Sequence, residues 1–131
     1  MAAKAKVLVV DDDPDCRQFV EAVLEADLPA DIWQAENGEA GLRLARTRQP
    51  DLIVLDVMMP VKDGYDTFLA LRDDPATAKI PVIMLTTLAE MGGYMEGKAR
   101  RLQPDNFVEK PVDPAVLLRM ARHLVGGARR G

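Results

Sequence analysis

The sequence has only one cysteine, Cys16, and one histidine, His123, among its 131 residues. A single cysteine excludes an internal disulfide framework and any zinc site built on several thiolates, and it suits a reducing compartment. No apolar run is long enough to cross a bilayer, and no signal-peptide core follows Met1. These absences predict a small soluble domain of the cytoplasm with no membrane partner.

Basic residues are fewer than acidic ones, with 17 Lys and Arg against 21 Asp and Glu and a formal net charge of −4. This balance argues against direct binding to nucleic acid, because such domains usually present a net basic face. With 48% hydrophobic and 29% charged residues, the composition is that of an ordinary globular protein. We expect one domain over residues 1–125 and a flexible tail or linker stub over 126–131.

Short apolar runs without polar alternation divide the chain. They are residues 7–10, 52–55, 82–85 and the weaker pair 107–108. Such runs, rich in β-branched residues, are typical of strands covered on both faces, as in a parallel sheet. A fifth candidate, residues 32–35, is less apolar and suits an edge of the sheet.

Helical patterns lie between these runs. Asp13-Pro14 and Asp113-Pro114 each combine an N-cap with a proline at the first helical position, and Asn37 is a third cap. Asp66 or Thr67 begins a further helix, which residues 73–75 end. Segment 88–104 contains three glycines and predicts a short or mobile fourth helix. Strands alternating with helices predict a doubly wound (βα)5 α/β fold with a parallel sheet.

Reactive side chains follow four of the expected strands. Asp11 and Asp12 come after the first run, Asp56 after the third strand, Thr86 after the fourth and Lys110 after the fifth. In an open α/β sheet, ligands bind outside the carboxyl ends of the strands. We therefore expect these side chains to meet at one edge of the sheet.

Three carboxylates in one place require a cation. Two of them repel each other by about 4 kcal/mol at 4 Å with an effective dielectric of 20. One divalent ion together with Lys110 would balance the three charges. Oxygen ligands without thiolate or imidazole favour a hard ion, and Mg²⁺, with Mn²⁺ as a substitute, fits best. A carboxylate beside such an ion and a lysine can accept a phosphoryl group.

Four segments, in this order, resemble the response-regulator receiver domains (CheY-like) of two-component signal transduction. They are VLVVDDDP, PDLIVLDVMMPVKDGYD, IPVIMLTT and FVEKP, within a similarity that extends from Lys6 to about Val125. The resemblance implies a flavodoxin-like three-layer sandwich whose five-stranded parallel sheet has the order 2-1-3-4-5.

The resemblance also implies a metal site around the phosphoacceptor. Asp56 would accept the phosphoryl group. Asp12 and Asp56 would bind Mg²⁺ through their side chains, Met58 would bind it through its backbone carbonyl, and Asp11 would hold a metal-bound water.

Further residues would contact the phosphoryl group and report its presence. Lys110, the Thr86 hydroxyl and the Thr87 backbone N–H would contact its oxygens, and Phe107 would be the aromatic switch. A cis peptide bond is implied before Pro111. Phe107 stands where many members have tyrosine.

The implied partners are a sensor histidine kinase or a phosphotransfer protein, and a downstream protein target. The target would bind the face formed by the fourth helix, fifth strand and fifth helix, on a monomer or a phosphorylation-dependent homodimer. The chain would be regulatory rather than an enzyme, catalysing only its own phosphoryl transfer and dephosphorylation.

Alternatives from other classes stay open. A phosphatase or mutase of the haloacid dehalogenase type also uses an aspartyl phosphate, but it needs a second Asp two positions after the nucleophile, where this chain has Met58. A receiver-like interaction module driven by a partner or ligand would need no phosphorylation. A flavin-binding domain of the same fold disagrees with the acidic loop after the first strand.

Overall fold

A five-stranded parallel sheet forms the middle layer of the fold, in the order β2-β1-β3-β4-β5. The computed structural model describes residues 4–56, 64–86 and 106–130. The strands are β1 (Ala5–Val10), β2 (Ala30–Ala35), β3 (Leu52–Asp56), β4 (Val82–Thr86) and β5 (Asn106–Glu109). The sheet, its order and the edge position of β2 confirm the predictions from the sequence.

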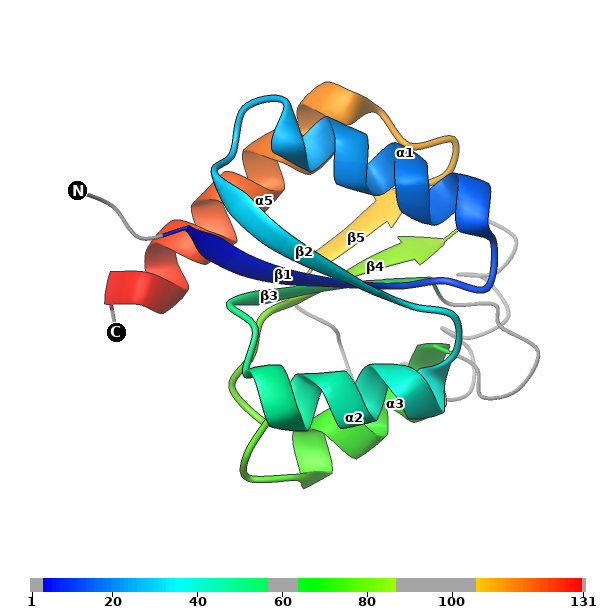
Figure 1. Cartoon of the computed structure of the whole chain (residues 1–131), viewed down its shortest axis with the longest axis vertical. Coiled ribbons are helices and arrows are strands. Elements are labelled where there is room, and N and C mark those ends of the chain that lie inside the picture. The colour runs from blue at the N-terminus through cyan, green and yellow to red at the C-terminus, as the bar shows by residue number, and fades with distance from the viewer. Residues whose placement is uncertain (1–3, 57–63, 87–105, 131) are drawn as a thin grey trace.

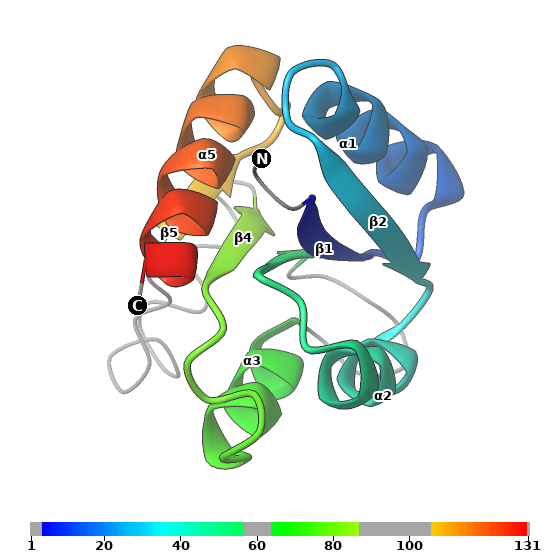
Figure 2. The same cartoon turned by 60° about the vertical axis from the view of Figure 1, so that its left-hand side comes forward.

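Helices cover both faces of the sheet (Figures 1 and 2). They are α1 (Pro14–Glu25), α2 (Gly38–Arg48), α3 (Gly64–Asp73) and α5 (Pro114–Arg130). Helices α1 and α5 lie on one face, and α2 and α3 lie on the other. The fourth helix predicted within residues 88–104 lies outside the described residues. Among the helices described, none is both long and apolar enough to cross a membrane.

The sheet has a separate hydrophobic core on each face. In β1, Leu8 and Val10 belong to the core beneath α2 and α3, whereas Val7 and Val9 belong to the core beneath α1 and α5. All four side chains are at most 1% exposed. Because successive side chains of a strand point to opposite faces, a strand covered on both sides must be apolar throughout. This explains the uninterrupted apolar runs.

Capping side chains begin three of the helices as predicted. The Asp13 side chain accepts a hydrogen bond from the Asp15 amide, and Asn37 Oδ1 accepts one from the Ala40 amide. Asp113 Oδ1 accepts one from the Ala115 amide. Each oxygen pairs with an amide that the first helical turn leaves without an intrahelical partner.

Two helix ends differ from the prediction. Helix α3 begins at Gly64, so Asp66 lies in its first turn, where a negative charge favours the positive end of the helix dipole. Helix α5 continues to Arg130, although residues 126–131 are predicted to form a flexible tail. Glycine lowers helix propensity by about 1 kcal/mol but does not forbid helical dihedral angles. The domain boundary at residue 125 stays a prediction.

We expect Gly41→Ala to destabilise the protein by about 1–3 kcal/mol, because it overpacks the contact between α2 and β1. A Cβ atom at Gly41 would lie 2.9 Å from Cγ2 and 3.1 Å from Cγ1 of Val10, a buried side chain with little freedom to move. A Cβ at Gly126 would meet nothing within 4 Å. Gly126→Ala is therefore the control and should stabilise α5 by about 1 kcal/mol. Urea unfolding of both variants measures the difference, and a stabilising Gly41→Ala would contradict the packing described.

Candidate functional site

The site lies where the parallel strands end. Asp11 directly follows β1, Asp56 is the last residue of β3, Thr86 is the last of β4, and Lys110 directly follows β5. The register pairs Asp56 with Leu85 and Thr86 with Glu109, so these strand ends lie at one edge of the sheet. This is the arrangement predicted from the sequence.

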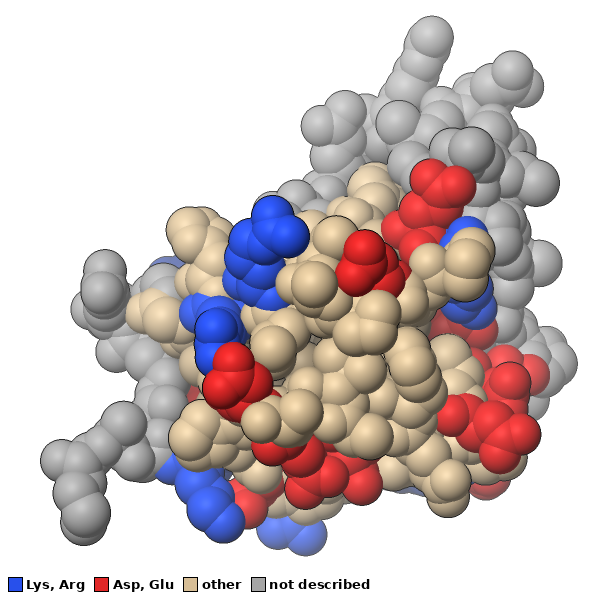
Figure 3. Space-filling model, turned by 90° about the horizontal axis from the view of Figure 1, so that it is seen from above, with Lys and Arg blue, Asp and Glu red and all other residues tan. Residues whose placement is uncertain are grey.

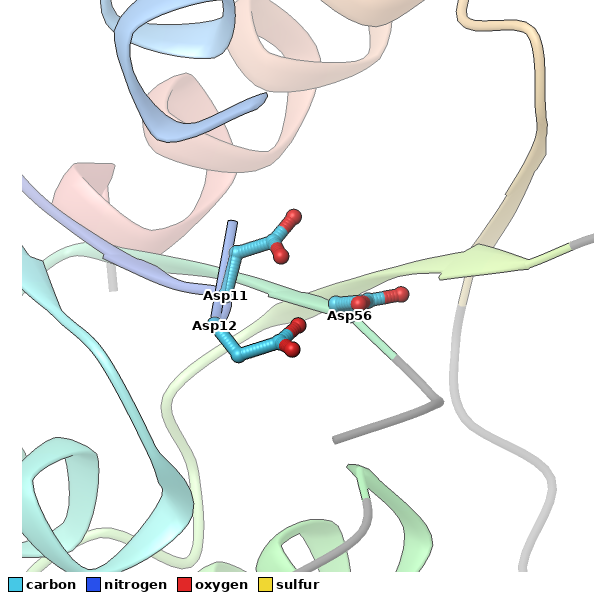
Figure 4. A group of neighbouring side chains, drawn as sticks. All are labelled: Asp11, Asp12 and Asp56. Carbon is cyan, nitrogen blue, oxygen red and sulfur yellow. The ribbon is translucent and has the colours of Figure 1, made fainter. Parts of the chain in front are cut away.

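Asp11, Asp12 and Asp56 form a close group of carboxylates (Figure 4). One carboxylate oxygen from each residue lies within 4.8 Å of the other two. Asp11 is 2% exposed and Asp56 is 3% exposed, whereas Asp12 is exposed to solvent. The group therefore has two buried members at the sheet edge and one member that faces water.

One oxygen of Asp11 is held within the loop and the other is not. Asp11 Oδ1 accepts a hydrogen bond of 3.0 Å from the Asp13 amide. Asp11 Oδ2 is buried and has no hydrogen-bond partner among the described residues. A buried polar atom without a partner is costly, so this oxygen is suited to a bound ion or to a water held by one.

Among the described residues that line the cavity over the carboxylates, Lys110 is the one cation. Its Nζ lies 2.7 Å from Asp56 Oδ1. Its backbone amide donates to the Thr86 carbonyl oxygen at 2.7 Å, which fixes the residue beside β4. Burial opposes the charge on the ammonium, but the hydrogen bond that Lys110 donates to Asp56 and the charges of Asp56 and Asp11 outweigh it and raise the pKa of Lys110. The side chain is therefore protonated at neutral pH.

An open cavity of about 570 Å³ lies over the carboxylates. Its walls are formed by Asp11, Asp12, Asp13, Cys16, Phe19, Asp56, Lys110, Pro111 and Val112. The Lys110-Pro111 peptide bond beside it is cis, as predicted. Figure 3 shows acidic side chains gathered at its right-hand edge. This is the side on which the strands end in Figure 1.

Cys16 and Phe19 are wall residues that the sequence did not indicate. Helical periodicity places both on α1, but nothing in it shows which turn of the helix faces the loop after β1. Burial raises the pKa of the Cys16 thiol to about 12, and the neighbouring Asp11 adds to this increase. The thiol therefore stays protonated at neutral pH, consistent with an unreactive residue.

The remaining predicted site residues fall into two groups. Thr86 is fully buried at the end of β4, and Phe107 in β5 is partly buried against the core beneath α2 and α3. Met58 and Thr87 lie outside the described residues, so their roles stay predictions.

The donor set fits a hard divalent cation. Three oxygen ligands lie close together, one carboxylate oxygen is buried without a described partner, and Lys110 supplies only one positive charge. Mg²⁺ is usually bound by a few carboxylates together with water and phosphate oxygens, which the open cavity accommodates. Neither thiolate nor imidazole belongs to the group, so nothing in it favours a softer ion.

Comparison with known proteins agrees with this geometry. The model of the response regulator receiver domain family matches residues 7–122. Protein PilH of Pseudomonas aeruginosa is 33% identical over 123 residues, which cover 94% of this chain and 99% of PilH. The DNA-binding dual master transcriptional regulator RpaA of Synechocystis is 38% identical over 120 residues, 92% of this chain and 48% of RpaA. The chain thus spans about half the length of RpaA.

A solved structure agrees as well. The chemotaxis protein CheY4 of Vibrio cholerae superposes with a TM-score of 0.81 at 30% identity, covering 93% of this chain and 99% of CheY4. The chain belongs to the response regulator receiver domain family, the CheY-like domains of two-component systems.

Proposed function

We propose that this receiver domain accepts a phosphoryl group on Asp56, with Mg²⁺ bound, and that the resulting aspartyl phosphate changes which partners it binds. The observation that supports this most strongly is the contact of 2.7 Å between Lys110 Nζ and Asp56 Oδ1, beside two further carboxylates. A nucleophilic carboxylate, a fixed cation and a cation-binding group are the components that phosphoryl transfer requires.

The transfer is a displacement at phosphorus. A carboxylate oxygen of Asp56 forms the new O–P bond while the N–P bond of a phosphohistidine breaks, and the imidazole leaves with the electron pair. Lys110 loses its contact with the free carboxylate and pairs instead with a phosphoryl oxygen. The Thr86 hydroxyl and the Thr87 backbone N–H donate to the remaining oxygens, which stabilises the charge there.

Mg²⁺ would be held by the side chains of Asp12 and Asp56, by the backbone carbonyl of Met58, and by Asp11 through a water. When bound, the ion neutralises negative charge on the phosphoryl oxygens. Mn²⁺ can substitute, since it accepts the same oxygen ligands.

The switch begins at Thr86. When its hydroxyl moves toward the phosphoryl group, it vacates space that Phe107 can enter from β5. This changes the surface formed by the predicted fourth helix, β5 and α5, where the downstream target would bind or a second copy would form a homodimer. Moving the active state from 1% to 99% of the population needs roughly 5.5 kcal/mol of preferential stabilisation.

The phosphoryl donor would be a sensor histidine kinase or a phosphotransfer protein in the cytoplasm. The domain is regulatory, so its catalysis is limited to its own phosphorylation and dephosphorylation.

Intact-mass measurement after incubation with acetyl phosphate tests the proposal. We expect one phosphoryl adduct on the wild type with Mg²⁺, none with EDTA, and none on Asp56→Asn. Asp51→Asn, which changes a carboxylate at the opposite end of β3, is the matched control and should be phosphorylated like the wild type. No adduct on a wild type that binds Mg²⁺ would contradict the proposal and favour a partner-driven module.

A further inference from the structure

Arg17 on α1 connects three elements near the acidic group. Its Nη1 donates to the backbone carbonyl oxygen of Asp11 at 2.7 Å, and its Nε donates to Gln34 Oε1 on β2 at 3.0 Å. Gln34 Nε2 in turn donates to Glu21 Oε1 at 3.2 Å. The guanidinium is partly buried and is held in one orientation by these contacts.

These contacts hold the chain at Asp11, one of the three members of the acidic group. The Asp11 amide donates to the Ala35 carbonyl oxygen at 3.0 Å, and Asp11 Oδ1 accepts from the Asp13 amide at 3.0 Å. With Arg17 on the carbonyl oxygen, every polar atom of Asp11 except Oδ2 has a partner among the described residues. The remaining polar atom is Oδ2, and Asp11 is one of the residues that line the cavity.

We propose that Arg17 is a positioning residue for Mg²⁺ binding, which fixes the chain at Asp11 and Asp12 so that their carboxylates meet Asp56. This inference rests on the proposed function. Arg17 reaches the site only through the main chain, since it is not among the residues that line the cavity. Binding the Asp11 carbonyl oxygen and Gln34 Oε1 together requires two directed N–H donors on one rigid plane, so lysine cannot replace Arg17.

Arg17→Lys tests the role because it keeps the charge but cannot hold both acceptors. We expect the dissociation constant for Mg²⁺, measured by isothermal titration calorimetry, to rise about tenfold, as is typical when a group that orients metal ligands is lost. In the metal-free protein, the Asp13 amide should also exchange its hydrogen several-fold faster relative to the Ala40 amide, which donates to the Asn37 side chain at the start of α2.

Arg72→Lys is the matched control. Arg72 is also partly buried and donates through Nη1 to a backbone carbonyl, that of Ile80, at 2.8 Å, but it does not line the cavity. Its replacement should lower stability as Arg17→Lys does, yet leave Mg²⁺ affinity within about twofold of the wild type. A general loss of stability would move both variants alike.

Two results would overturn the inference and leave the proposed function intact. One is an unchanged Mg²⁺ affinity in folded Arg17→Lys, and the other is an equal loss of affinity in Arg72→Lys. If Arg17→Lys does not fold, Gln34→Met decides, because it keeps Arg17 but removes the acceptor that orients it, together with the donor to Glu21. A loss of about threefold in affinity supports the role, and no loss overturns it. A wild type without Mg²⁺ binding would overturn the proposed function and this inference together.

Discussion

Asp12→Asn is expected to lower the affinity for Mg²⁺ about a hundredfold and, in the metal-free protein, to raise the free energy of unfolding. Both effects have one cause. The substitution removes a cation ligand and relieves repulsion among carboxylates whose oxygens lie within 4.8 Å of one another. Two like charges at such a distance repel each other by about 1 kcal/mol in water and by about 4 kcal/mol at an effective dielectric of 20.

Asp13→Asn is the control, since it makes the same chemical change one residue along the chain. Asp13 also lines the cavity, but it caps α1 and does not belong to the close group. Asparagine caps a helix about as well as aspartate. The Mg²⁺ affinity of Asp13→Asn should therefore stay within about threefold of the wild type. Calorimetric titration and thermal unfolding in EDTA measure the two quantities, and equal effects at both positions would contradict the site described.

Lys110→Met is expected to change two properties in opposite directions. It should raise the affinity for Mg²⁺, because Mg²⁺ no longer competes with the Lys110 ammonium, which lies 2.7 Å from Asp56 Oδ1. It should slow phosphorylation by acetyl phosphate about a hundredfold, a loss typical of removing one preorganised electrostatic contact to the reacting group.

The control for this substitution is Lys79→Met, at an exposed lysine that does not line the cavity over the carboxylates. It should change neither the affinity nor the rate. A Lys110→Met variant that loses Mg²⁺ binding and phosphorylation together would indicate that Lys110 only maintains the fold around Asp56.

Much of the fold could be predicted because strands buried on both faces leave an unmistakable pattern. Residues 52–55 are apolar without interruption, and each belongs to one of the two cores. The group of Asp11, Asp12, Asp56 and Lys110 was predictable for a related reason. Strand ends in a parallel sheet share one edge, so residues that follow the strands must come together.

Side-chain contacts between separate helices and strands could not be predicted from the sequence in this way. Arg17 and Gln34 are ordinary polar residues on a helix and an edge strand, and only the packing of α1 beside β2 brings them together. The first turn of α3 was misassigned because Asp66 fits a cap and a first-turn acid equally well. The continuation of α5 past Gly126 was missed because propensity describes an isolated helix, whereas α5 packs on the sheet through Leu117, Ala121 and Val125.

The central claim is that Asp56 itself carries the phosphoryl group, and reductive trapping tests it most directly. Borohydride reduces an aspartyl phosphate to homoserine and leaves a free carboxylate unchanged, so peptide mass spectrometry after the reaction locates the modified residue. We predict homoserine at position 56 alone, and only in samples treated with both acetyl phosphate and Mg²⁺. A phosphorylated protein in which Asp56 is unreduced and the modification lies at another residue, such as His123, would contradict the account.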